Sequence, residues 1–417
     1  MQKAPWQRTV TLMMVTQFLA AVGFSTVFPF LPAYVEQLGS RSGTTVFWVS
    51  AVFSGQAFAM MIASPIWGAV SDRYGRKPML IRALVGGAVL VFLMGLARSS
   101  EELFWLRVIQ GLVTGVVSAA SSMAASVTPR DRLGYSMGLM QTGQWAGIAI
   151  GPVLGGVLSY AVGIRYSFMV TAVLLLAGGL IVMLGVKEDF VPPANRQRGV
   201  GGMFRQWGAV LTAKGVSLTY ILRFTAWLGR TMIMPFLPLF IASLTVRQDL
   251  AGLYTGLTIG VSSLAATYSG IVLGRLGDKV GHKRLLIVSA LATALFYVPM
   301  TFATAVWQVV LFNTLIGFAV GGVLPAISAL LARYTDPSIA GSVYGIDNSV
   351  GAASRAFSPL LAAAILAATS GGGTPNYALL FPFTAALFVV TALLGAWRLP
   401  SGDTDSEIDG RSQSAST

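Results

Sequence analysis

The segment GAVSDRYGRKPML, residues 68–80, joins two apolar stretches and is partly repeated by GRLGDKVGHKR, residues 274–284. The two copies are 206 positions apart, and the same shift superposes PFLP at 29–32 on PFLP at 235–238. Similarity at one constant spacing indicates that a single structural unit is used twice. The sequence therefore predicts two related halves.

Apolar residues dominate the chain outside these loops. Of 417 residues, 55% are hydrophobic and 10% are charged, and the mean hydropathy is +0.72. Soluble domains carry about 25% charged residues, so a mainly water-exposed surface is excluded. Stretches of about 20 apolar residues, enough to cross about 30 Å of hydrocarbon, recur along the chain. The expected helices are 10–35, 45–69, 78–97, 103–127, 135–158, 165–186, 215–243, 251–273, 284–303, 306–331, 339–368 and 376–397.

These stretches predict an all-α membrane protein with twelve transmembrane helices in two parallel, pseudo-symmetric six-helix halves. The halves are parallel because an even number of helices makes both units insert the same way up. The expected domains are an N-terminal bundle at 1–186, a hydrophilic cytoplasmic linker at 187–214, a C-terminal bundle at 215–398 and a disordered cytoplasmic tail at 399–417. One chain supplies a complete pathway, so we expect a functional monomer in a lipid bilayer.

The basic residues predict the orientation. If both termini lie on one side, 20 of the 28 Lys and Arg residues fall on that side and 4 on the other. Basic residues near helix ends tend to stay cytoplasmic. We therefore expect a multi-pass protein of the cytoplasmic (inner) membrane with both termini in the cytoplasm.

Several function classes are excluded by residue content. The chain has no Cys and one His, His282 in a basic loop, so we expect no metal site and no cofactor. A membrane-embedded enzyme would need a clustered nucleophile, base or metal set, which the sequence lacks. The net charge of +13 is spread over short loops and forms no basic patch with interleaved aromatic residues, so nucleic acid is not an expected partner.

The loop at 68–80 resembles the signature G-x-L-a-D-r-x-G-r-k of the major facilitator superfamily. The resemblance covers about residues 8–398, implies the major facilitator fold, and is greatest to the twelve-helix drug:proton antiporter branch. In that family these loops act as conformational latches between the halves. The latch residues that the resemblance implies are Gly68, Asp72, Arg73, Gly75, Arg76, Gly274, Asp278 and Gly281.

Two further segments carry the resemblance. RVIQG at 107–111 resembles the family's second motif, whose arginine is associated with proton coupling, although Arg107 is alternatively a structural residue that reaches the outer surface. GIAIGPVLGG at 147–156 is similar to the antiporter pattern G-x-x-x-G-P-x-x-G-G. Glycines four residues apart make a flat stripe for close helix packing. The packing residues are Gly147, Gly151, Pro152 and Gly155.

Charged residues inside apolar helices are the candidates for coupling to protons. Asp347 is the only carboxylate clearly within an expected span. Burial raises the proton affinity of a carboxylate and a neighbouring arginine lowers it, so a change of neighbours could drive binding or release of a proton. The alternative is that Asp347 is a structural partner of Arg223 or Arg230. The coupling candidates are Asp347, Arg107, Arg230 and Arg355.

Polar and aromatic side chains in the central helices are the candidates for substrate binding, although each of them is alternatively a packing residue. They are Gln17, Gln141, Gln144, Trp145, Trp227, Arg223, Asn313, Tyr344 and Asn348. The arginines among them favour neutral or anionic amphiphiles over lipophilic cations.

The expected function is secondary active transport: proton-coupled efflux of hydrophobic or amphiphilic small molecules by alternating access. The alternative is an exporter or uniporter of a specific metabolite or lipid-like solute on the same fold.

Overall fold

The structure is a computed structural model, and it describes residues 5–41, 43–113, 115–129, 132–186, 188, 215–334, 340–370 and 373–399. Of the expected linker only Glu188 lies within the described residues, and of the expected tail only Leu399. The N-terminal half comprises α1 (Pro5–Thr26), α2 (Leu31–Leu38), α3 (Thr45–Tyr74), α4 (Arg76–Gly95), α5 (Ser100–Val113), α6 (Val116–Val127), α7 (Leu133–Ala161) and α8 (Ile164–Gly185). The C-terminal half comprises α10 (Val216–Met232), α11 (Leu237–Leu244), η2 (Gln248–Leu250), α12 (Ala251–Val280), α13 (His282–Met300), α14 (Val306–Arg333), α15 (Ala340–Ser370), η4 (Tyr377–Leu379) and α16 (Leu380–Arg398).

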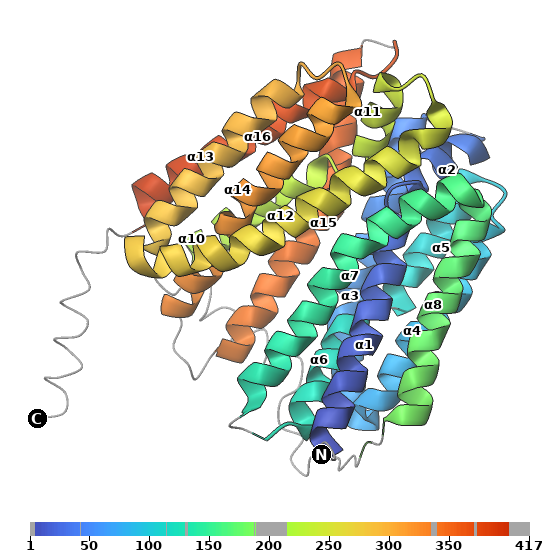
Figure 1. The fold of residues 1–417 in the computed structure, drawn as a ribbon, viewed down its shortest axis with the longest axis vertical. Coiled ribbons are helices and arrows are strands. Elements are labelled where there is room, and N and C mark those ends of the chain that lie inside the picture. Colours follow the sequence, from blue (N-terminus) through green and yellow to red (C-terminus); the bar gives the residue numbers. More distant parts are fainter. Residues whose placement is uncertain are drawn as a thin grey trace, which may run out of the picture.

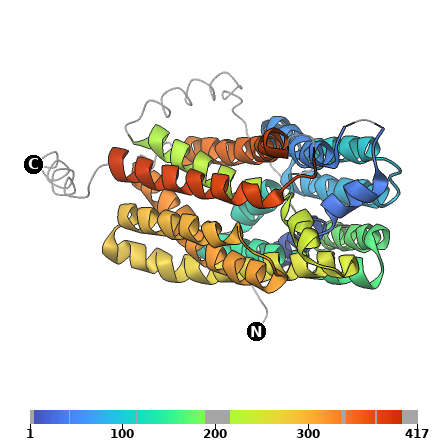
Figure 2. The same cartoon turned by 90° about the horizontal axis from the view of Figure 1, so that it is seen from above.

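The helices form two bundles that lie side by side, one from each half of the sequence (Figure 2). Within the described residues, 10 helical segments are long and apolar enough to cross a membrane. Two further crossings run beside them (Figure 1). One is formed by α5 followed by α6, and the other by α7. The first of these is interrupted at Gly115, and α7 is rich in glycine and glutamine. The predicted all-α architecture with two six-helix halves is confirmed.

Three helices that we predicted as continuous are broken, so those predicted spans are wrong in detail. The first crossing changes from α1 to α2 over residues 27–30, and the seventh changes from α10 to α11 over residues 233–236. Both breaks fall in the repeated PFLP segment, because proline removes a backbone hydrogen bond and restricts the residue before it. The third break, at Gly115, immediately precedes α6 and has no counterpart in α14, which is continuous.

The repeated loop forms the same turn in both halves. Gly75 has a φ of 94° between α3 and α4, and Gly281 has a φ of 90° between α12 and α13. The N–H of each glycine donates to the carbonyl oxygen four residues earlier, at 3.0 Å and 2.9 Å. Residues with a side chain rarely adopt this backbone conformation, so glycine at both positions is required by the turn.

Contacts between helix ends hold the loop against its own bundle. The Glu188 carboxylate accepts the backbone N–H groups of Arg76 and Lys77, each at 2.8 Å, which satisfies the free donors at the start of α4. In return, Lys77 Nζ donates to the carbonyl oxygens of Met183 and Val186, at 3.0 Å and 2.6 Å, near the end of α8. The two helices therefore cap each other.

Glycines bring α7 into close contact with α1. A Cβ atom added to Gly147 would lie 2.6 Å from the Cβ of Ala21 and 2.7 Å from the carbonyl oxygen of Phe18. A Cβ added to Gly143 would lie 2.8 Å from the carbonyl oxygen of Met14. Side chains would therefore push the two backbones apart.

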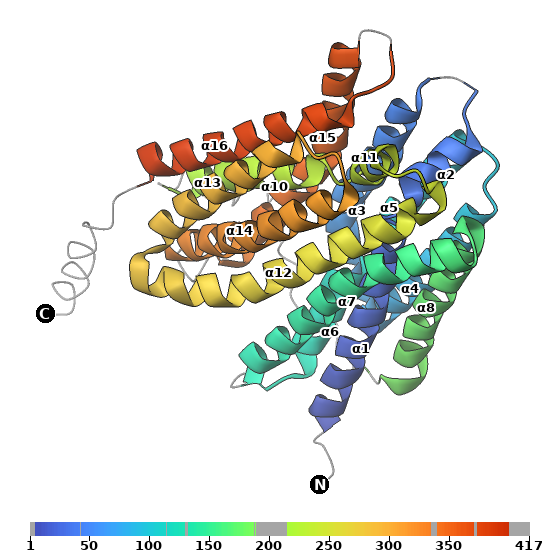
Figure 3. The ribbon, with the colours of Figure 1, turned by 45° about the horizontal axis from the view of Figure 1, so that its top comes forward.

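The same helix joins the two halves, at one end only. A Cβ added to Gly156 of α7 would lie 2.6 Å from the carbonyl oxygen of Gly252, at the start of α12. At the other end, Gly138 of α7 and Gly274 of α12 have no neighbour within 4 Å of an added Cβ. Toward this second end, which carries the N-terminus and the repeated loops, the bundles spread apart (Figures 1 and 3). We call it the basic end.

We predict that Gly147→Ala lowers the thermal midpoint of unfolding in detergent, whereas Gly138→Ala on the same helix does not. Alanine favours a helix at both positions, so the difference isolates the packing against α1. Overpacking costs about 1–3 kcal/mol, and only Gly147 has neighbours that would clash. Equal midpoints for the two variants would contradict the close α1–α7 contact.

Candidate functional site

A buried ion pair links α10 to α15. Asp347 is 6% exposed, and its Oδ2 accepts a hydrogen bond from Arg223 Nη2. Arg223 Nη1 also donates to the Ser328 hydroxyl of α14, at 3.2 Å. Oδ1 of Asp347 is buried and has no partner among the described residues. Of the two arginines that the sequence left open as partners, the structure therefore pairs Asp347 with Arg223.

Two further arginines flank one tryptophan in the same half. The Cζ atoms of Arg230 and Arg355 lie 5.9 Å and 5.6 Å from the centroid of a ring of Trp227. Gly351 leaves this space open, because a Cβ added there would lie 3.6 Å from Arg355 Nη1 and 3.9 Å from Trp227 Nε1. Neither arginine forms an ion pair with an acidic residue in the described part of the chain. Aromatic faces attract cations without neutralising them, so this cluster keeps two positive charges.

Arg107 is buried in the N-terminal half, with 3% of its surface exposed. Its Nη1 donates to Gln56 Oε1 at 2.9 Å and to Gln110 Oε1 at 3.0 Å, while Nε and Nη2 are buried without a partner among the described residues. The alternative in which this arginine reaches the outer surface is wrong, because its guanidinium points to amides on α3 and α5. Those amides are neutral, so they solvate the charge without balancing it.

The polar candidates do not all lie together. Gln17 is buried in α1 and donates to Gln144 of α7 at 3.1 Å. On α7, Trp145 is one position from Gln144 and is 37% exposed, and Gln141, three positions away, is also exposed. Asn313 instead joins α14 to α12, donating to the carbonyl oxygen of Thr258 at 3.3 Å. The backbones of Tyr344 and Asn348 belong to α15, but their side chains lie outside the described part of the structure.

The latch residues lie at the basic end. The last turns of α3 include Gly68, Asp72 and Arg73. The side chains of Asp72 and Arg73 lie outside the described part of the structure. In the second copy Asp278 is exposed and lies 3.4 Å from His282 Nε2.

Sequence reasoning missed two residues of these networks, Glu188 and Ser328. Glu188 follows α8 and is 111 positions from Lys77, and Ser328 is 105 positions from Arg223. A lone acidic residue after an apolar helix is a weak sign of a cap, and a serine in an apolar helix gives no sign at all. Among the described residues, no three His, Asp or Glu side chains are grouped as metal ligands.

The sequence and the fold are similar to known transporters. Residues 13–222 and 219–415 each match the Major Facilitator Superfamily. Multidrug resistance protein MdtG from Salmonella schwarzengrund is 34% identical over 87% of this chain and 89% of that protein. MdtG from Enterobacter lignolyticus is 32% identical over 96% of both chains. A crystal structure of a mutant of the nucleoside transporter NupG has a TM-score of 0.78 at 13% identity and covers 94% of this chain and 100% of that one.

We predict that Arg223→Gln destabilises the protein more than the double variant Arg223→Gln, Asp347→Asn does. Removing one partner of a buried ion pair leaves an uncompensated charge, which costs about 3–5 kcal/mol, whereas removing both charges relieves most of that loss. The thermal midpoints of the two single variants and the double variant measure the coupling. Additive losses would show that the two charges do not interact.

Proposed function

The chain belongs to the major facilitator superfamily, and on that premise we propose that it exports hydrophobic or amphiphilic compounds from the cytoplasm by alternating access. The observation that carries the proposal is the 34% identity to MdtG, a multidrug resistance protein, over 87% of the chain. The chain is a transporter and not an enzyme, since the proteins it matches belong to a transporter superfamily. The alternative, transport of one specific metabolite, is not favoured by these relatives.

The arrangement of the halves supports alternating access. They meet through the glycine contact between α7 and α12 and through packing of α3 against α15, and they spread apart at the basic end (Figure 1). Basic residues near helix ends tend to be cytoplasmic, so the conformation is open to the cytoplasm and both termini lie there. Rocking of one half against the other would open the opposite end.

Asp347 is the proposed proton-carrying group. Protonation would remove its negative charge and release Arg223 from the ion pair between α10 and α15. The freed guanidinium would then need another partner, because an isolated charge in this environment is unfavourable. A proton would thereby change the charge and the packing of the C-terminal half. Arg107 would contribute a positive charge from the N-terminal half, held only by amides.

The charge of the central helices favours some substrates over others. Arg230 and Arg355 are positive and lack an acidic partner among the described residues, and Trp227 lies between them as an apolar surface. A lipophilic cation would be repelled there, whereas an acidic group would gain charge-assisted hydrogen bonds. Neutral or anionic amphiphiles are therefore the proposed substrates, exchanged for protons by a single chain.

We predict that an imposed pH gradient drives accumulation of fluorescent anionic or neutral amphiphiles in proteoliposomes, and that Asp347→Asn abolishes the dependence on the gradient. Asp249→Asn is the matched control, since Asp249 is exposed and pairs with Arg247 outside this site. Because Asp347→Asn leaves Arg223 unpaired, the double variant with Arg223→Gln is tested as well. Unchanged gradient dependence in both Asp347 variants would remove this residue from coupling.

We also predict that Arg355→Gln selectively weakens transport of the anionic probe. A hydrogen bond to a charged group contributes about 1.5–3 kcal/mol, which corresponds to roughly 10- to 100-fold in apparent affinity. Transport of a neutral probe of similar size should change little. An equal loss for both probes, measured as initial rates over a range of concentrations, would show that Arg355 has a packing role only.

A further inference from the structure

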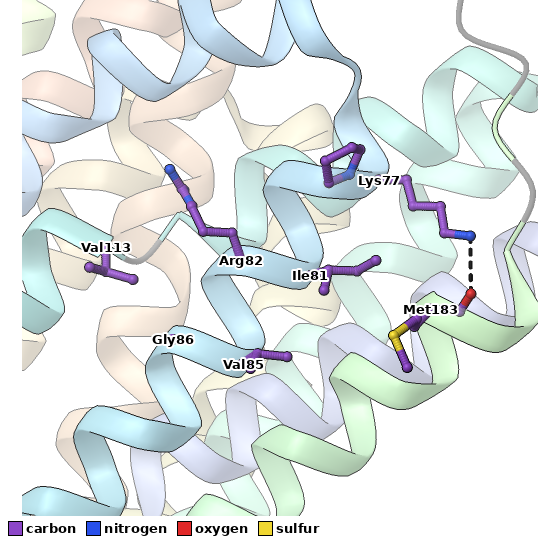
Figure 4. A pocket seen from close by; sticks show the side chains of 8 residues that line it. Lys77, Ile81, Arg82, Val85, Gly86, Val113 and Met183 are labelled. Carbon is purple, nitrogen blue, oxygen red and sulfur yellow. Dashed lines mark hydrogen bonds between the residues drawn. The ribbon is translucent and has the colours of Figure 1, made fainter.

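A groove on the outer surface of the N-terminal half has no assigned occupant. It has a volume of about 720 Å³ and lies over α4, between the end of α5 and the end of α8. Its exposed lining is apolar, and two basic residues stand beside it (Figure 4). The lining residues are Lys77, Pro78, Ile81, Arg82, Val85, Gly86, Val113 and Met183. Figure 1 shows α4 and α8 on the side of the N-terminal bundle that is away from the C-terminal bundle.

Arg82 carries an unbalanced charge at this groove. Its Cζ lies 3.3 Å from the centroid of a ring of Trp67, and its Nε and Nη1 are buried without a partner among the described residues. Trp67 cannot neutralise the charge, and its Nε1 is occupied by the carbonyl oxygen of Leu112 at 2.6 Å. A charge in a transmembrane helix is unfavourable unless something pairs with it. The structure thus holds a cation that is positioned but not neutralised.

The internal repeat separates what the fold needs from what is particular to this groove. Lys77 aligns with Lys283 under the shift of 206, and both lysines donate to carbonyl oxygens near the end of another helix, Lys283 to Leu399 at 2.5 Å. Arg82 aligns with Val288, which is 64% exposed. An apolar residue is the ordinary choice for a lipid-facing position. The arginine is therefore not required by the fold of the repeated unit.

The depth of Arg82 suits a lipid headgroup. It follows Arg76, the first residue of α4, by six positions, or about 9 Å along a helix, which places it near the membrane surface at the basic end. Among the described side chains, Glu188 is the acidic group at this end of α4, but its carboxylate binds the backbone N–H groups that start the helix. The side chains of Lys77 and Arg82 therefore keep an excess of positive charge beside an apolar groove.

We propose that the groove binds one anionic phospholipid of the cytoplasmic leaflet. Its phosphate would pair with the guanidinium of Arg82 and with the remaining donor of Lys77. An acyl chain would lie along Ile81, Val85 and Met183. Basic pockets between transmembrane helices on the cytoplasmic side recognise anionic headgroups in this way. The site is separate from the central helices and does not depend on the proposed function.

The test is the thermal stability of the full chain in detergent, titrated with phosphatidylglycerol or with phosphatidylcholine. Phosphatidylglycerol should raise the midpoint of the wild type more than phosphatidylcholine does. In Arg82→Gln this difference should disappear, with an apparent affinity for phosphatidylglycerol about fivefold weaker, as expected for one basic side chain near the membrane surface. Arg82→Lys keeps the charge and should retain most of the difference.

Two controls decide between a site and a general lipid effect. Arg284→Gln removes an exposed arginine at the same end of the other half and should leave the response to phosphatidylglycerol unchanged. In phosphatidylcholine alone, Arg82→Gln should be about as stable as the wild type, because it removes an unbalanced charge. Equal stabilisation of wild type and Arg82→Gln by phosphatidylglycerol, or equal effects of the two lipids on the wild type, would overturn the proposal.

Discussion

The close contact of α7 with α1 on one side and with α12 on the other is the constraint on which the rest of the structure depends. It exists because glycines replace side chains along α7, at Gly147 toward α1 and at Gly156 toward α12. Apolar side chains gain little by leaving lipid for protein, so close backbone packing and hydrogen bonds must hold membrane helices together. Because the second contact covers only one end of α7, the halves remain joined there and separate at the basic end.

Charge is handled differently in the two halves. In the C-terminal half, Asp347 and Arg223 neutralise each other, while Arg230 and Arg355 lie beside the ring of Trp227 and have no acidic partner among the described residues. In the N-terminal half, Arg107 is held by two neutral amides. The central helices therefore keep a positive excess near Asp347, the proposed proton-carrying group. Loading of protons and binding of acidic substrates would then act on the same group of side chains.

The repeat explains which features belong to the fold and which belong to one half. Gly75 and Gly281 form the same turn, and Lys77 and Lys283 form equivalent contacts with helix ends, so these residues are part of the repeated unit. Among the described residues, the interruption at Gly115 and Arg82 occur in the N-terminal half alone. Features without a counterpart are not explained by the shared fold, and they therefore indicate functions specific to one half.

The sequence by itself determined the fold class, the two related halves and the family, because apolar length, internal repetition and short glycine motifs are local properties of the chain. It also identified Asp347 and the arginines, since a charge within an apolar span is visible in one dimension. Only the tertiary structure decided that Asp347 pairs with Arg223, that Arg107 points inward, and that Glu188 caps α4. Those partners are between 51 and 124 positions apart, and no local pattern specifies which faces of packed helices meet. The breaks at residues 27–30 and 233–236 depend on both the sequence and the tertiary structure. Proline in the sequence permits a break, and packing determined that the helices break there.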